Sequence, residues 1–199
     1  MPRRREFPHD RDCALSLGDE YRHRGLPGSI QEDVLQIGDS LAQIAPETPG
    51  FQCAIHGDFR PSSLLVSTKN ATEISSVMNW GYFESQSLPF LDLFHFMTAR
   101  GPTKTWGARV VQVFKSMEAK TPSTGIVRDY AQHVGVVPEL APQFLIVYWL
   151  RQCLLRMRTD TPQLAKILQE GISVPLNYLR ANGWSATGQP VEIELQVKK

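Results

Sequence analysis

The chain has 199 residues, a formal net charge of +1 and 42% hydrophobic residues. This length is enough for one domain with a sizeable core, and the near-neutral charge gives no reason to expect nucleic acid or an acidic membrane as a partner. The three cysteines are widely spaced, without the paired spacing of a zinc site, and no apolar run is long enough to span a bilayer. We therefore expect a cytoplasmic protein that does not bind membranes.

The first part of the chain divides into an irregular segment and a helix. Residues 1–28 carry many charges, three glycines and prolines, which predicts an irregular or mobile N-terminal segment. From Ser29 onward, apolar residues repeat at helical spacing, and Glu32 occupies the capping-box position. This helix should end before Pro46. We place the main domain at 29–182, followed by a tail.

A small β-hairpin is predicted after this helix. Alternation and turn residues predict an extended segment at 51–55, strands at 64–67 and 74–78, a turn at 69–71 between those strands, and a loop at 81–90. This hairpin is expected to lie next to the motif loop on a helical body.

The remainder of the chain is predicted to be helical. Helices are expected at 92–99, 104–119, 124–134, 139–158 and 161–181, the last interrupted or shortened near Gly171 and Pro175. The tail 183–199 is weakly patterned, with a short alternating stretch typical of an edge strand. The fold class is therefore mainly α with a small β-hairpin, an α+β arrangement.

The most informative motif occupies the loop and hairpin of this arrangement. Its residues are His56-Gly57-Asp58, Pro61, Leu64-Leu65-Val66, Asn79-Trp80, Pro89 and Asp92. The motif resembles the C-terminal lobe of the aminoglycoside phosphotransferase and choline kinase-like family, which has a protein kinase-like fold. The family pattern is H-G-D-x-x-x-x-N, a strand pair, an aliphatic-D-W and an Asp that opens a helix.

The resemblance implies a role for each matching residue. Asp58 matches the base that orients the substrate hydroxyl for phosphoryl transfer. His56 would support the loop through hydrogen bonds, and Asp92 would brace it from the start of the helix. The alternative interpretations from residue type are a loop carboxylate that caps a turn for Asp58 and a plain N-terminal helix cap for Asp92, and within this motif the base position is favoured for Asp58. Arg60 is expected to be an exposed side chain near the loop.

Two metal-binding positions depart from the family pattern. Ser63 stands where the family has a metal-binding Asn, and Asn79 stands where it has the principal Mg²⁺ carboxylate. The resemblance implies ATP and Mg²⁺ as cofactors, but Mg²⁺ prefers carboxylate oxygen and near-octahedral geometry. Both changes weaken metal binding, so Ser63 and Asn79 are interpreted as degenerate metal positions.

The N-terminal β lobe of the family is missing from the sequence. Only 55 residues precede His56, and none of them is a lysine. A complete member needs a β-rich lobe with a phosphate-covering loop and a strand-borne Lys, and no glycine-rich phosphate loop can be found. The resemblance therefore implies a kinase-like C-terminal lobe standing alone.

Three functions remain open from the sequence. The first is a pseudo-phosphotransferase with impaired or no catalysis. The second is an active ATP-dependent kinase of small-molecule hydroxyls, completed by a missing lobe or a partner, and the third is a helical interaction module. A lone lobe should expose an apolar face near Phe51, Phe59 and Trp80, which favours self-association, a partner protein or a small-molecule ligand.

Overall fold

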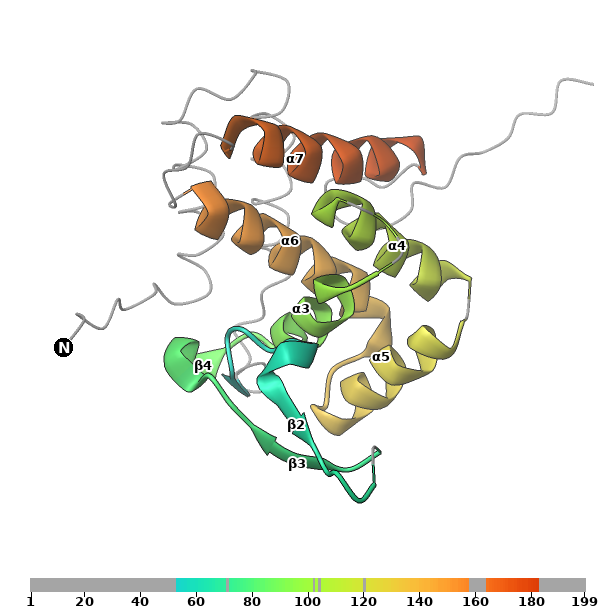
Figure 1. Cartoon of the computed structure of the whole chain (residues 1–199). Helices are drawn as coiled ribbons and strands as arrows, with labels where there is room; N and C mark the ends of the chain where they lie inside the picture. Colours follow the sequence, from blue (N-terminus) through green and yellow to red (C-terminus); the bar gives the residue numbers. More distant parts are fainter. Residues whose placement is uncertain are drawn as a thin grey trace, which may run out of the picture. The chain divides into compact units, whose positions relative to one another are not determined.

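The computed structural model describes residues 53–70, 72–101, 103, 105–119, 121–157 and 164–182 (Figure 1). The predicted segment 1–28, the helix from Ser29 and the tail 183–199 lie outside the described residues. The chain divides into two compact units, of which one is Pro46–Trp149 and the other combines Met1–Ala45 with Leu150–Lys199. The predicted site residues all belong to the unit Pro46–Trp149.

The strands of the described residues form two separate antiparallel pairs. β1 (Cys53–Ile55) pairs with β4 (Glu84–Ser87), and β2 (Leu64–Val66) pairs with β3 (Ile74–Val77). The β2–β3 hairpin is the one that the sequence predicts, with Leu64 opposite Val77. Figure 1 shows it projecting from the helices of its unit.

β4 corrects the prediction of a loop at 81–90. The segment begins with the 3₁₀ turn η3 (Trp80–Tyr82), and Glu84–Ser87 then forms a strand against β1. Its sequence is polar, without the β-branched and aromatic residues that favour strands. The strand exists because its backbone groups pair with β1, a long-range contact that local propensity does not reveal.

Helices make up most of the described structure, which confirms the mainly α character with a small β part. Their bounds are α3 (Leu91–Ala99), α4 (Trp106–Glu118), α5 (Pro122–His133), α6 (Ala141–Met157) and α7 (Leu164–Ala181), with 3₁₀ turns η2 (Pro61–Ser63) and η4 (Pro138–Leu140). α3 packs on α4, and α4 packs on α5. Each helix agrees with a predicted one to within a few residues.

The course of α7 contradicts the predicted interruption near Gly171 and Pro175. The helix is continuous, and Pro175 lies inside it. A proline inside a helix removes one hydrogen bond and costs about 3 kcal/mol. The side chains of Ile172, Leu176 and Leu179 are buried, and the burial of this apolar stripe offsets the cost.

An aromatic cluster fixes where α3 begins. Phe90 precedes the helix with a φ of 70°, in the left-handed region that non-glycine residues rarely occupy. Its side chain is fully buried and its ring centroid lies 5.4 Å from that of Phe94, 5.0 Å from that of Tyr130 and 5.1 Å from that of Phe144. This packing holds the strained backbone and places the first turn of α3, which carries Asp92.

Candidate functional site

The loop after β1 is shaped by Gly57. This residue has a φ of +81°, and a Cβ atom there would lie 2.2 Å from the carbonyl oxygen of Tyr82. Only glycine combines a left-handed φ with so close an approach of another backbone segment. The loop 56–60 is therefore packed directly against the 3₁₀ turn η3.

Asp92 ties this loop to α3. One carboxylate oxygen accepts a hydrogen bond from the backbone N–H of His56 at 2.5 Å, and the other accepts from the N–H of Gly57 at 2.9 Å. Asp92 is in the first turn of α3, but the residue at the N-cap position is Phe90, which makes no side-chain cap. Its carboxylate thus contacts the loop, a different arrangement from that of a plain helix cap.

The His56 ring connects the loop to the segment after β3. Its Nε2 donates to the carbonyl oxygen of Met78 at 2.6 Å, and its Nδ1 accepts from the backbone N–H of Asp58 at 3.2 Å. A carbonyl can only accept and an amide N–H can only donate, so the ring is the neutral tautomer with a proton on Nε2. The side chain is buried, with the ring of Trp80 at a centroid distance of 4.8 Å. The geometry gives His56 a structural position.

The Asp58 carboxylate is presented by the braced loop and has a partner on each oxygen. Oδ2 accepts from Nε of Arg60 at 3.1 Å and also from an Nη nitrogen of that guanidinium. Oδ1 lies 3.1 Å from Nε2 of His95 on α3. Arg60 is exposed, as expected, but it forms an ion pair with Asp58 that the sequence analysis does not anticipate.

His95 is the site residue that sequence reasoning misses. Behind its contact with Asp58, its Nδ1 lies 3.2 Å from the hydroxyl of Tyr148, which lies 2.6 Å from Oγ1 of Thr98. The signal was present in the spacing, because residues three apart on a helix share a face and His95 follows Asp92 by three. A lone histidine among apolar residues gives no other indication of its partner.

Burial lowers the pKa of His95 from its ordinary value of 6.5. The negative charge of Asp58 and its hydrogen bond to the ring oppose this effect, and the positive charge of Arg60 adds to it. Asp92 contributes a smaller opposing charge. Burial is the largest of these influences, so the ring is neutral near pH 7.

Ser63 and Asn79 lie near the loop but differ in orientation. The Ser63 hydroxyl is buried and donates to the carbonyl oxygen of Asp58 at 3.1 Å, while its backbone carbonyl accepts from Met78 N–H at 2.8 Å. Asn79 is exposed, with a left-handed φ of 67°. The hydroxyl of Ser63 thus closes the loop, and Asn79 offers a neutral amide to solvent.

This donor set does not fit a magnesium site of the kinase type. In the described part of the chain, no group of three or more His, Cys, Asp or Glu side chains could hold a metal ion. The Asp58 carboxylate has Arg60 and His95 on its oxygens, and Asn79 supplies no charge. Mg²⁺ requires charged oxygen ligands in near-octahedral geometry, which these residues do not provide.

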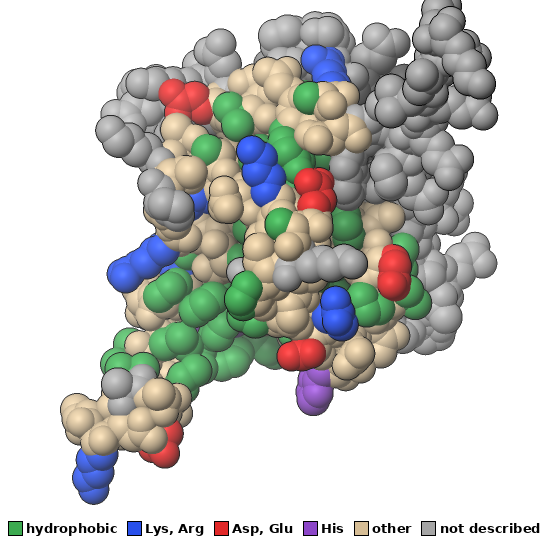
Figure 2. Space-filling view, turned by 90° about the vertical axis from the view of Figure 1, so that its right-hand side faces the viewer, with side chains coloured by type: hydrophobic (Ala, Val, Ile, Leu, Met, Phe, Trp, Pro, Cys, Tyr) green, Lys and Arg blue, Asp and Glu red, His purple; other side chains and the backbone are tan. Residues whose placement is uncertain are grey.

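An apolar face surrounds the hairpin and η3. It consists of the exposed side chains Leu65, Val66, Ile74, Met78, Trp80, Tyr82 and Phe83, and Figure 2 shows hydrophobic side chains gathered where the hairpin leaves the unit. Of the residues expected to form such a face, Trp80 belongs to it. Phe59 is half-buried against Phe96, and Phe51 lies outside the described residues.

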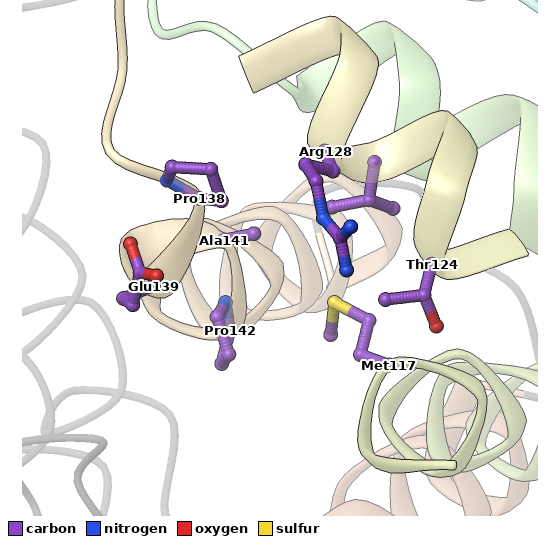
Figure 3. A pocket seen from close by; sticks show the side chains of 8 residues that line it. Met117, Thr124, Arg128, Pro138, Glu139, Ala141 and Pro142 are labelled. Carbon is purple, nitrogen blue, oxygen red and sulfur yellow. The ribbon is translucent and has the colours of Figure 1, made fainter. Parts of the chain in front are cut away.

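A shallow pocket of about 240 Å³ opens elsewhere in the same unit (Figure 3). It is formed by α4, α5, η4 and the start of α6, and is lined by Met117, Thr124, Val127, Arg128, Pro138, Glu139, Ala141 and Pro142. None of these is a predicted site residue, and no group that sequence reasoning singled out for catalysis points into it.

The comparisons with known proteins add no assignment. No protein-family model, curated protein or solved structure matches the chain. Among the described residues, no helix is long and apolar enough to cross a membrane.

Proposed function

We propose that the chain is an aminoglycoside phosphotransferase-like domain that acts as a pseudo-phosphotransferase. It retains a braced loop that presents Asp58, a hydrogen-bond acceptor suited to the hydroxyl of a small ligand. It no longer supports metal-dependent phosphoryl transfer at an appreciable rate. The proposal also includes the fold, a kinase-like C-terminal lobe, and the kind of ligand, a small molecule.

The proposal rests on one contrast: hydrogen bonds hold the loop in place, whereas the metal positions lack the charged ligands of the family. The loop is held by the two hydrogen bonds of Asp92, and its His56 ring is fixed by Met78 and by the loop itself. Such bracing is what a hydroxyl-orienting carboxylate needs, because positioning supplies much of the catalysis in phosphoryl transfer. The same contacts support ancestry in the family whose motif the sequence resembles.

The electrostatics of the site argue against metal-dependent transfer. Asn79 carries no charge where the family has a carboxylate, and the Arg60 guanidinium lies directly on Asp58. A divalent cation at Asp58 would have to displace the Arg60 guanidinium from the carboxylate, a modest obstacle because Arg60 is exposed and solvent screens the pair. ATP and Mg²⁺ therefore belong to the ancestral chemistry in this proposal.

A second candidate is an active kinase of small-molecule hydroxyls, completed by another chain. It is favoured by the Asp58 carboxylate itself, whose side chain keeps 17% of its surface exposed. A carboxylate at the surface of a braced loop remains accessible to a hydroxyl. In that case a partner would have to supply the phosphate-binding groups and the metal ligands.

Isothermal titration with ATP, with and without Mg²⁺, tests the proposal. We expect no Mg²⁺-dependent heat from the wild-type chain. Asn79→Asp restores the missing carboxylate at a backbone conformation that Asp tolerates, and in combination with Arg60→Ala it should raise the affinity for Mg²⁺ titrated alone, while ATP binding stays absent because the sequence has no glycine-rich phosphate loop. Asn177→Asp, at an exposed position of α7, adds the same charge elsewhere and should change nothing.

A transfer assay tests whether the chain is an active kinase without a partner. The wild-type chain is incubated with radiolabelled ATP, Mg²⁺ and a panel of amino sugars and amino alcohols. Labelled product that disappears with Asp58→Asn would overturn the pseudo-phosphotransferase proposal and establish the active kinase. A background rate equal in the wild-type chain and in Asp58→Asn supports the proposal.

A further inference from the structure

Asp58 is the residue through which a ligand would bind, and its orientation depends on more than the loop that carries it. Its side chain could rotate freely if only the backbone of the loop were held. One oxygen is bound by Arg60, a flexible and exposed side chain from the same loop. The other is bound by His95, whose ring is mostly buried on α3. The His95 contact is therefore the more rigid of the two.

The His95 ring is itself held from behind. Tyr148 on α6 is buried, with 1% of its surface exposed, and its hydroxyl lies 3.2 Å from Nδ1 of His95. On its other side this hydroxyl lies 2.6 Å from Oγ1 of Thr98, which is also 1% exposed and lies 2.8 Å from the carbonyl oxygen of Phe94. The contacts run in one line from the loop through α3 to α6.

The proton on Nε2 follows from its partner. Asp58 accepts, so Nε2 of a neutral His95 must carry the proton and Nδ1 must be the acceptor. The single hydroxyl protons of Tyr148 and Thr98 cannot serve Nδ1, the contact between the two hydroxyls and the Phe94 carbonyl oxygen at once. Asp58 therefore determines the tautomer, and the buried Tyr148 hydroxyl helps to hold the ring in its orientation.

We infer that His95 is a positioning residue for Asp58 and that the buried Tyr148 holds the His95 ring in the orientation in which it performs this role. The inference deepens the proposed function, since it names the residues that orient the ligand-binding carboxylate. It does not make His95 a catalytic residue, because the ring acts on a ligand only through Asp58.

The test uses the ring nitrogens of the full chain labelled with ¹⁵N and needs no nucleotide. Long-range ¹H–¹⁵N spectra at about pH 8 distinguish the two neutral tautomers, and His95→Gln assigns the His95 signals. We expect the Nε2–H tautomer for His95. His56 is an internal reference, because backbone groups alone fix its tautomer.

Two variants separate a positioning role from a merely structural one. Tyr148→Phe keeps the ring but removes the hydroxyl that contacts Nδ1, and it should shift the His95 ring signals while those of His56 are unchanged. Asp58→Asn removes the charge that raises the pKa of His95, so the midpoint of the His95 titration should fall. Since Asp58 lies at the surface, this second variant remains informative if Tyr148→Phe does not fold.

Other results would overturn the inference. They are an Nδ1–H tautomer for His95 in the wild-type chain, unchanged His95 signals in Tyr148→Phe, or an unchanged midpoint in Asp58→Asn. Each of these readings is independent of ATP binding. A chain that binds or transfers phosphate after all would contradict the proposed function and leave the positioning of Asp58 intact.

Discussion

The Asp92 carboxylate accepts a hydrogen bond from the backbone N–H of His56, 36 positions earlier in the chain, and a second from that of Gly57. Three strands, two of which form the hairpin, and two 3₁₀ turns lie between these residues in sequence. The carboxylate therefore joins the start of α3 to the loop that presents Asp58. The properties of the site should depend on this junction and on the residues that hold either side of it.

Asp92→Asn should loosen the loop. An amide offers one acceptor oxygen for two N–H groups and turns an NH₂ group toward one of them, and a hydrogen bond to a charged group contributes about 1.5–3 kcal/mol. We expect a loss of this order in urea unfolding and faster hydrogen exchange at the amides of His56 and Gly57. Asp129→Asn, at an exposed position of α5, is the matched control and should behave as wild type.

Gly57→Ala should be among the most damaging small substitutions. The new Cβ would meet the Tyr82 carbonyl at 2.2 Å, on a backbone with a φ of +81°. Positive φ in a non-glycine residue costs on the order of 1–3 kcal/mol, and the clash adds to it. Gly125→Ala in α5 has open space around its Cβ and should be neutral or stabilising. Equal melting temperatures for the two variants would contradict the described approach of η3 to the loop.

The variants of Phe90 should show an unusual order of stability. Removing its buried ring in Phe90→Ala should cost about 3–5 kcal/mol. Phe90→Gly loses the same ring but relieves the left-handed backbone at a φ of 70°. We therefore expect Phe90→Gly to be no less stable than Phe90→Ala in urea unfolding, whereas at ordinary helical positions glycine is worse than alanine by roughly 1 kcal/mol.

The lowered pKa of His95 gives the stability a pH dependence of definite sign. In the unfolded chain this histidine takes up a proton near its ordinary pKa of 6.5, while in the folded chain it does so only at lower pH. The contribution is fully present above about pH 6.5 and is lost as the pH falls from there through the lower pKa of the folded chain. The unfolding free energy of the wild-type chain minus that of His95→Gln should decrease between pH 8 and pH 5. A difference that grows on acidification would contradict the burial of the ring.

The apolar face should drive association of the chain with a second copy of itself. Val66 and Ile74 lie opposite each other in the hairpin and are 54% and 56% exposed, so they offer a small apolar surface that a second copy can cover. Sedimentation coefficients should rise with concentration, and the double variant Val66→Ser with Ile74→Ser should abolish the rise. Ile126→Ser is the control, because Ile126 is as exposed as Ile74, at 56%, but lies on α5. A concentration-independent wild type would show that the face is tolerated in a monomer.

The local parts of the fold could be predicted from the sequence. The helices α3 to α6 and the β2–β3 hairpin follow from apolar spacing and turn residues, which act over a few positions. β4 could not be predicted, because a polar Glu-Ser-Gln-Ser segment becomes a strand only against β1. The continuity of α7 through Pro175 depends likewise on burial that outweighs local propensity.

Some residues of the candidate site could likewise be predicted from the sequence, and others could not. Asp58, His56 and Asp92 could be singled out because they stand in a motif, and the structure brings all three together. His95 could not be paired with Asp58, since the contact joins positions 37 apart and the distance in space is set by the packing of α3. The Arg60 ion pair was also missed, because a loop arginine has many equally available rotamers.

The Asp58–His95–Tyr148 line has a consequence for the synthesis of the chain. Tyr148 follows His95 by 53 positions, so a nascent chain that has exposed the entire loop, the hairpin and α3 still lacks the group that orders the ring. The line of contacts can close only after Tyr148, about halfway along α6, has left the ribosome. A product that stops short of Tyr148 would keep every residue of the recognisable motif and yet hold its central carboxylate in an undefined orientation.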